Sequence, residues 1–209
     1  MVFLLDSTLA FPDPALADED GLLAVGGDLM PERLILAYQH GIFPWFSEGD
    51  PICWYSPHER FVIFASEIHI SRSMSRLIRS GTYTVTFDQA FRDVITHCSA
   101  IKRKGQKGTW ITADMIAAYI ALHERGIAHS IEVWHDGKLI GGMYGVAVGR
   151  VFCGESMFSL RPDASKLAMI WLCQNKNYEL IDCQLHTSHL ESMGARFISR
   201  EAFMGYLSS

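Results

Sequence analysis

The chain has 209 residues, of which 49% are hydrophobic and 20% are charged, a composition typical of a globular protein and unlike that of a disordered chain. At this length most of the chain's surface can be buried, so a stable core needs neither a metal ion nor a disulfide. Eighteen lysines and arginines against 23 aspartates and glutamates give a net charge of −5. This charge excludes a uniformly basic protein but leaves room for a local basic patch.

Sequence features of membrane, secreted and metal-binding proteins are absent. The longest uncharged apolar stretch, residues 139–149, contains four glycines and is shorter than the about 18 residues of a membrane span. The N-terminus lacks the basic region of a secretory signal. Five cysteines without a CxxC pair and nine histidines without a metal-binding spacing indicate neither a disulfide framework nor a metal site. We therefore expect a cytoplasmic protein that needs no metal and no membrane.

The first 66 residues are rich in proline, glycine and aromatic residues, and one helix is expected among them, from Pro31 to His40. From Ser71 onward the predicted elements are more regular. They are a helix capped by Ser71 and ending at Gly81, a strand over 83–87, a helix over 89–99 capped by Asp88, and a helix capped by Thr112 and ending at Gly126.

The second half of the chain alternates strands with helices. Strands over 129–134 and 138–148 are joined by Asp136-Gly137, a hairpin signal. The remaining predicted elements are a strand over 151–157, a helix over 164–176, a strand over 179–184, a short helix over 188–193, a strand over 196–198 and a last helix from Ser199. The order from residue 83, β-α-α-β-β-β-α-β-α, predicts an α+β fold that resembles the GNAT acyltransferases.

Two predicted strands carry polar side chains among apolar neighbours. Side chains alternate along a strand, so Asp182 and Gln184 should share one face. By the same rule, Glu155 and Met157 should share a face with Cys153. A structural, hydrogen-bonded aspartate is the alternative for Asp182, and a rim charge is the alternative for Glu155. Two strands that each present a carboxylate or an amide favour a site that orients and activates a nucleophile.

Basic residues form two clusters. Arg72, Arg76 and Arg79, which we call the arginine stripe, have the spacing of one helix face. A second cluster occupies one loop and precedes Trp110; it consists of Lys102, Arg103, Lys104 and Lys107. Both clusters together suit a phosphate-binding surface with an aromatic side chain for base stacking, and a solvated face is the alternative.

Other common chemistries lack their motifs. The sequence contains no GxSxG elbow and no P-loop. The helix after Asp163 is not preceded by the GxGxx(G/A) loop with which CoA-dependent acyltransferases hold pyrophosphate. This absence argues against CoA as the acyl donor.

Nearly the whole chain, from about Phe11 onward, resembles the leucyl/phenylalanyl-tRNA–protein transferases. The stretches that carry this resemblance are 21–29, 41–46 (GIFPWF), 108–112 (GTWIT), 129–134 (HSIEVW), 141–146 (GGMYGV), 154–159 (GESMFS), 164–166 (ASK) and 180–184 (LIDCQ). The resemblance implies a small N-terminal α/β domain, residues 1–66, packed on a GNAT-like catalytic domain, residues 67–209. It also implies transfer of Leu, Phe or Met from aminoacyl-tRNA to proteins that begin with Arg or Lys, as an N-degron for proteolysis, by a monomer without a cofactor.

The resemblance also assigns roles to residues. It makes Asp182, Gln184 and Glu155 the catalytic group. It implies that the donor's side chain lies in a pocket of Met143, Phe152, Met157 and Ile181, and that the terminal adenosine is held by Trp45 and Trp110. A CoA-dependent N-acyltransferase and a non-catalytic RNA-binding module are the two rival hypotheses. The second rival leaves the polar residues of the two strands unexplained.

Overall fold

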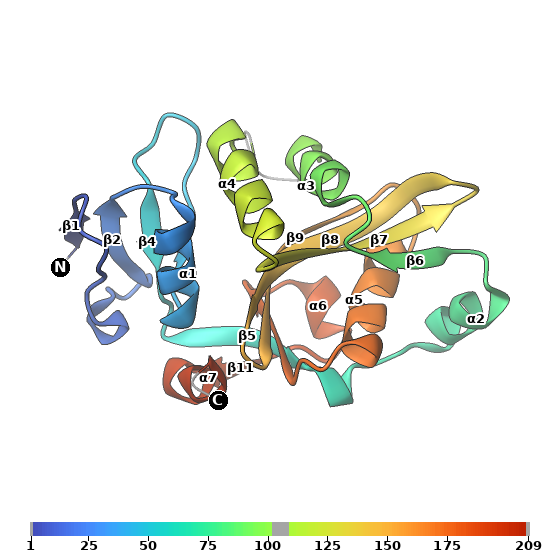
Figure 1. The fold of residues 1–209 in the computed structure, drawn as a ribbon. Helices are drawn as coiled ribbons and strands as arrows, with labels where there is room; N and C mark the ends of the chain where they lie inside the picture. The colour runs from blue at the N-terminus through green and yellow to red at the C-terminus, as the bar shows by residue number, and fades with distance from the viewer. Residues whose placement is uncertain (1, 102–108, 208–209) are drawn as a thin grey trace.

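A computed structural model describes residues 2–101 and 109–207, which have the predicted α+β fold and form two sheets. The smaller sheet has four short strands in the order β1-β2-β4-β3 and packs beside helix α1 (Figure 1). Its elements are β1 (Phe3–Leu5), β2 (Leu22–Gly26), α1 (Pro31–Gln39), β3 (Phe43–Pro44) and β4 (Cys53–Tyr55), with a 3₁₀ turn at Pro14–Leu16.

The larger sheet has seven strands in the order β11-β5-β10-β9-β8-β7-β6. Their bounds are β5 (Glu59–Phe64), β6 (Thr84–Phe87), β7 (Ala128–His135), β8 (Lys138–Val148), β9 (Val151–Ser159), β10 (Leu180–Gln184) and β11 (Arg196–Ser199). Strands β9 and β10 are parallel, and the other neighbouring pairs are antiparallel. The predicted division at residue 66 stays a prediction, although β5, which precedes it, belongs to this larger sheet.

Helices cover both faces of the larger sheet (Figure 1). Helices α3 (Phe91–Ala100) and α4 (Ala113–Glu124) lie on one face, and α5 (Ala164–Asn175) and α6 (Ser188–Glu191) lie on the other. Helix α2 (Arg72–Ser80) lies at the end far from the smaller sheet, and α7 (Arg200–Leu207) lies beside β5 and β11. A second 3₁₀ turn spans Ala65–Glu67. None of the helices in the described ranges combines the length and apolar character that a membrane crossing needs.

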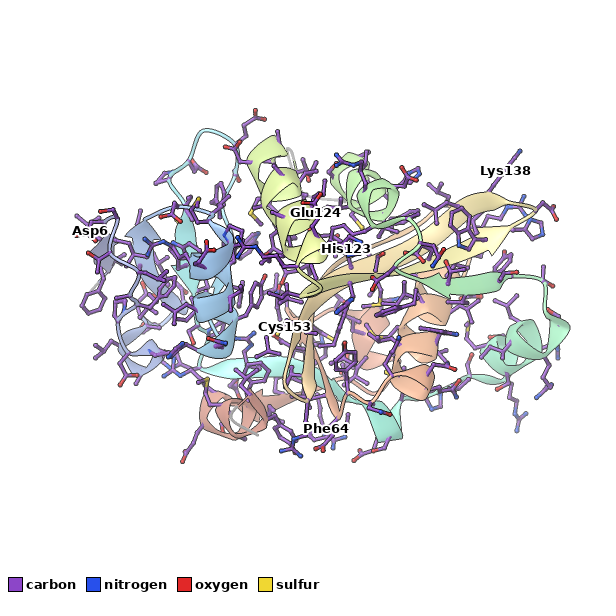
Figure 2. All side chains as sticks on the ribbon, in the orientation of Figure 1. Asp6, Phe64, His123, Glu124, Lys138 and Cys153 are labelled. Carbon is purple, nitrogen blue, oxygen red and sulfur yellow. The ribbon has the colours of Figure 1, made fainter. Side chains whose placement is uncertain are left out.

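Several predicted ends of elements are confirmed. The side chain of Ser71 accepts a hydrogen bond from the backbone N–H of Met74, and Thr112 does the same for α4. Gly81 ends α2 in the left-handed conformation. Asp136 and Gly137 have φ angles of 50° and 71°, as a type I′ hairpin turn requires, and the hairpin carries Lys138 away from the body of the protein (Figure 2).

The predicted cap of α3 is wrong. Helix α3 begins at Phe91 after Ala90, and the side chain of Asp88 accepts hydrogen bonds from the backbone of Ser130 at 2.8 Å and from the ring of His129 at 2.7 Å. The N–H of Ala90 donates to the buried Glu132 instead, at 3.4 Å. Glu132 of strand β7 therefore supplies the bond expected from Asp88, because the pairing of β7 with β6 brings its carboxylate to the start of α3.

The predicted faces of β9 are wrong for Met157. The pairing of β9 with β8 shifts between Tyr144 and Gly145, so Glu155 forms a bulge. A bulge changes the phase of the strand, and Met157 consequently packs on the α5 face while Cys153 packs on the α3–α4 face. Glu155 faces the same side as Cys153, where it contacts Tyr119 of α4.

Candidate active site

A cavity of about 380 Å³, which we call the central cavity, lies where strand β3 of the smaller sheet meets strands β8, β9 and β10 of the larger one. Its apolar wall includes Phe43, Met143, Met157 and Met169. Its polar wall includes Glu155, Asp182 and Gln184, and the indoles of Trp45 and Trp110 also line it. The structure therefore brings together the three polar residues and the two tryptophans that were singled out from the sequence.

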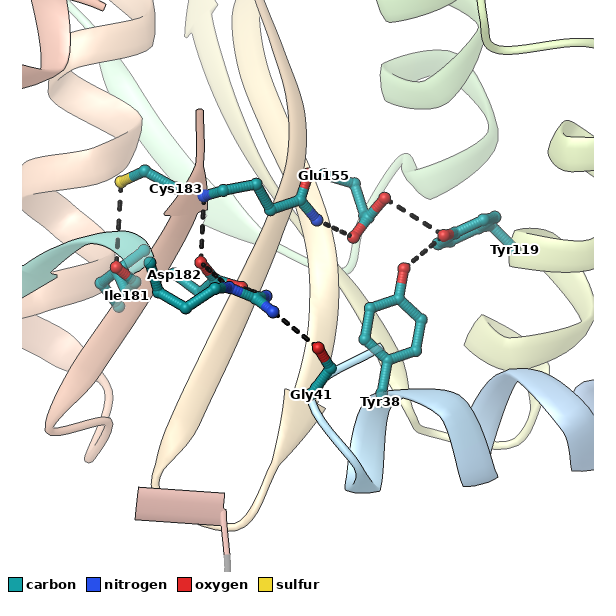
Figure 3. A network of polar contacts seen from close by, with 9 residues as sticks. Tyr38, Gly41, Tyr119, Glu155, Ile181, Asp182 and Cys183 are labelled. Carbon is teal, nitrogen blue, oxygen red and sulfur yellow. Dashed lines mark hydrogen bonds and ion pairs between the residues drawn. The ribbon is translucent and has the colours of Figure 1, made fainter. Parts of the chain in front are cut away.

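Asp182 is fully buried and forms an ion pair with Arg60. Arg60 donates from Nη2 to Oδ2 of Asp182 and from Nε to Oδ1, the latter at 3.3 Å (Figure 3). Its Nη1 donates to the backbone oxygen of Gly41 at 2.6 Å, and its guanidinium lies 5.0 Å from the ring of Phe43 and 4.3 Å from that of Phe203. A carboxylate bonded at both oxygens to a buried cation is held in one orientation.

Gln184 ends strand β10 in a strained conformation. Its φ is 58°, in the left-handed region that side chains other than glycine rarely adopt, and the pairing of β10 with β5 shifts between Asp182 and Gln184. The backbone N–H of Gln184 donates to Oδ1 of Asp182 at 3.0 Å, and its side-chain Nε2 donates to Oε1 of Glu155 at 2.8 Å (Figure 3). Asp182 thus fixes the backbone of the residue whose amide reaches Glu155.

Glu155 is a buried carboxyl in the wall of the central cavity, and its acidity is displaced toward neutrality. Burial raises the pKa of its carboxyl from 4.5 to about 7, and the charge of Asp182 adds to this effect. Hydrogen bonds from Tyr38, Tyr119 and Gln184 act in the opposite direction. The hydroxyl of Tyr119 donates to Oε2 of Glu155 at 3.1 Å and is itself bonded to the hydroxyl of Tyr38 (Figure 3). A carboxyl with a pKa near neutrality is suited to proton transfer at physiological pH.

The expected apolar pocket is present in part. Met143 and Met157 line the central cavity, and so does Met169, which the sequence did not single out. Phe152 and Ile181 are not among its lining residues, because they are fully buried in the apolar layer that also contains Met143.

Three polar contributors to the site were not assigned to it from the sequence. Arg60, Tyr38 and Tyr119 contact the catalytic candidates from β5, α1 and α4, segments distant in the chain from β9 and β10. Of these residues, Arg60 offered one available signal, a charge directly before the apolar run of residues 61–64. Nothing in the local sequence distinguishes the two tyrosines from ordinary core residues.

The structure places one of the two basic clusters, the arginine stripe, apart from the central cavity. The arginine stripe is confirmed as one exposed set of side chains on α2, and none of its members lines the central cavity. Lys102, Arg103, Lys104 and Lys107 lie outside the described residues. A second hollow of about 750 Å³ adjoins the central cavity and shares Trp45 and Trp110 with it. In residues 2–101 and 109–207, no three His, Cys, Asp or Glu side chains are grouped so that they could hold a metal ion.

Solved structures with a similar arrangement are remote. L-PGS from Bacillus licheniformis is 13% identical with a TM-score of 0.42, over 79% of this chain and 54% of that chain. A GCN5-related N-acetyltransferase from Kribbella flavida is 10% identical with a TM-score of 0.40, over 83% of this chain and 62% of that chain. Nothing about the function rests on similarities of this size.

Similarity in sequence is much closer. Proteins named leucyl/phenylalanyl-tRNA–protein transferase are 53% identical in Flavobacterium johnsoniae, over 100% of both chains, and 53% identical in Syntrophobacter fumaroxidans, over 99% of this chain and 90% of the relative. The relative from Psychromonas ingrahamii is 55% identical over 95% of this chain and 85% of its own length. The family model "Leucyl/phenylalanyl-tRNA protein transferase" matches residues 62–208, and the model of that family's N-terminal domain matches residues 27–58. The chain therefore belongs to the leucyl/phenylalanyl-tRNA–protein transferase family.

Proposed function

We propose that this aminoacyltransferase moves Leu, Phe or Met from aminoacyl-tRNA to the α-amino group of proteins that begin with Arg or Lys. The product would carry a new apolar N-terminal residue, which serves as an N-degron for proteolysis. The observation that carries the proposal is the central cavity, which joins an apolar wall to a hydrogen-bonded group of Glu155, Gln184 and Asp182.

The apolar wall suits the side chain of the donor. Met143, Met157 and Met169 are flexible and polarisable, so they can adapt to Leu, Phe or Met while offering no charged partner to a polar side chain. With the donor's side chain bound against these methionines, the ester carbonyl would lie toward Glu155 and Gln184. The ring of Trp45, which is 36% exposed, and that of Trp110 would hold the terminal adenosine of the tRNA by stacking.

The reaction needs a neutral amine held against an ester that is already activated. Glu155 would accept a proton from the acceptor's ammonium group, and its pKa of about 7 suits this role. The amine nitrogen then bonds to the carbonyl carbon, the ester C–O bond breaks, and the tRNA hydroxyl leaves with the proton that the nitrogen gives up. Gln184, whose Nε2 is engaged by Glu155, has its side-chain oxygen left to accept a hydrogen bond from the amine.

Asp182 would act in this reaction without touching the substrate. Both of its oxygens are bonded to Arg60, and Oδ1 also accepts the N–H of Gln184. We therefore assign Asp182 the role of a positioning residue, one that holds the strained end of β10.

The arginine stripe and the basic residues 102–107 would contact phosphates of the acceptor stem. Because charged tRNA is the donor, we place the reaction in the cytoplasm, and one chain supplies all the groups invoked.

The test is transfer of labelled Leu from leucyl-tRNA to a peptide that begins with Arg, in the absence of CoA. A peptide with the same sequence but an acetylated N-terminus is the matched control, since it has no free amine. A parallel reaction with acetyl-CoA in place of the tRNA tests the rival activity. Transfer of Leu from tRNA to the peptide with a free N-terminus, and not to the acetylated peptide, supports the proposal. Acetylation without aminoacyl transfer would replace it with the CoA-dependent reaction.

A further inference from the structure

We propose that Tyr38 and Tyr119 are positioning residues of the transfer reaction, whose linked hydroxyls hold the carboxylate of Glu155 in its working orientation. This inference rests on the proposed function, because it assigns Glu155 a part in proton transfer. It extends the site from the larger sheet to helix α1, which belongs to the N-terminal part of the chain (Figure 3).

The geometry is a continuous chain of hydrogen bonds between three elements. Tyr38 comes from α1, Tyr119 from α4 and Glu155 from the bulge of β9. The two tyrosine hydroxyls are bonded to each other, and that of Tyr119 donates to Oε2 of Glu155 at 3.1 Å. The other carboxylate oxygen, Oε1, accepts the amide of Gln184 at 2.8 Å. Both oxygens of Glu155 are therefore held, one from each side of the carboxylate.

A purely apolar contact would not need these hydroxyls. Tyr38 and Tyr119 are 2% and 0% exposed, and their rings meet edge to face with centroids 6.5 Å apart. Two phenylalanines could make the same ring contact without burying polar atoms, and burial of an unbonded hydroxyl is unfavourable. The hydroxyls are instead bonded in a line that ends on a carboxylate in the wall of the central cavity. Because these hydrogen bonds end on the carboxylate of Glu155, the two hydroxyls can affect the reaction as well as stability.

The charged and titratable groups around Glu155 come from the elements packed against it. They are Tyr38 of α1, Tyr119 of α4, Tyr144 of β8, Cys153 of β9, and Asp182 of β10 with its partner Arg60 of β5. Burial and, to a smaller extent, the charge of Asp182 raise the pKa of Glu155, and the tyrosine hydroxyls lower it. Removal of a hydroxyl should therefore leave Glu155 protonated to a higher pH, where it cannot accept the proton of the amine.

The experiment measures kcat/KM for leucyl transfer to the Arg-peptide between pH 6 and 8.5, for the parent and for Tyr119→Phe. We expect the acidic limb of the profile to move up by about one pH unit, with about a fivefold lower value at pH 7 that recovers toward pH 8.5. The change should lie in kcat, with KM for leucyl-tRNA near the parent value. The same peptide is used throughout, so titration of its own amine is common to both profiles.

Three further variants separate positioning from a structural effect. Tyr38→Phe removes the other hydroxyl that lowers the pKa of Glu155, so it should shift the limb in the same direction, and it carries the test if Tyr119→Phe does not fold. Tyr206→Phe of α7, a half-buried tyrosine that contacts Phe64, should keep the parent profile. In a Glu155→Gln background, Tyr119→Phe should not move the remaining profile.

Two outcomes would overturn the inference while leaving the proposed function in place, and a third would overturn both. An active parent combined with unshifted profiles in folded Tyr38→Phe and Tyr119→Phe variants would overturn it alone. So would an equal loss at every pH that follows the loss of thermal stability, since that pattern belongs to a structural role. An inactive parent would overturn the proposed function, and this inference with it.

Discussion

Replacement of Asp182 by alanine leaves the guanidinium of Arg60 buried without its carboxylate. The two side chains are 0% and 2% exposed respectively, so neither charge is solvated by bulk water in the parent protein. Breaking a buried ion pair by removing one member costs about 3–5 kcal/mol. Arg60 keeps its bond to Gly41 and its contacts with the rings of Phe43 and Phe203, which places the expected loss of stability near the lower end, at about 3 kcal/mol. Such a loss is a large part of the about 5–15 kcal/mol that stabilises a typical domain.

Urea unfolding at pH 7.5, followed by far-ultraviolet circular dichroism, measures this loss of stability. With a slope of about 2 kcal/mol per molar urea, the midpoint of Asp182→Ala should fall by about 1.5 M. The matched variants are Arg60→Met and the double variant Arg60→Met/Asp182→Ala. Because the double variant contains no unpaired charge, it should be at least about 2 kcal/mol more stable than the sum of the single effects predicts.

An Asp182→Ala variant whose stability lies within about 1 kcal/mol of the parent would refute this account, and so would single effects that add within about 0.5 kcal/mol. Asp182→Asn separates stability from transfer activity. It keeps an oxygen that can accept the N–H of Gln184 but removes the charge that faces Arg60. We therefore expect it to retain more transfer activity than Asp182→Ala when both are assayed under conditions in which they are folded.

Three further predictions concern Glu155, the donor and the tRNA. The pKa of Glu155, about 7 in the folded protein against an ordinary 4.5, means that its charged form opposes folding, so this group lowers stability as the pH rises from about 4.5 to 7. Urea unfolding should show Glu155→Gln gaining about 3 kcal/mol on the parent between pH 4.5 and 8, and a difference independent of pH would contradict this account. Isoleucyl-tRNA, whose side chain is branched at Cβ, should be about 10–200-fold poorer than leucyl-tRNA in kcat/KM, and equal rates would remove shape as the basis of selection. Alanine at all three positions of the arginine stripe should weaken binding of intact tRNA and reduce the slope of log K against log salt by about 0.7–0.9 for each phosphate that is no longer bound. Reaction with a short aminoacyl-adenosine should stay near the parent rate. An unchanged slope would make the stripe a solvated face.

Local signals in the sequence predicted most of the regular elements. Ser71 and Thr112 cap their helices, Gly81 ends one, and Asp136-Gly137 turns the hairpin, because each of these effects depends on backbone groups within a few residues. The polar residues of the two central strands were found in the same way, since a carboxylate in an apolar strand stands out. Membership of the family also came from short stretches of sequence.

The partners of those polar residues were decided by the tertiary structure alone. Arg60 and Asp182 are 122 positions apart, and Tyr38 and Tyr119 are 81 apart, so no local pattern connects them. The bulge at Glu155 reversed the faces predicted for the rest of its strand. A bulge and a long-range ion pair both depend on how strands are registered against one another. That register is set by the packing of the whole sheet and its helices, which residues near either position do not determine.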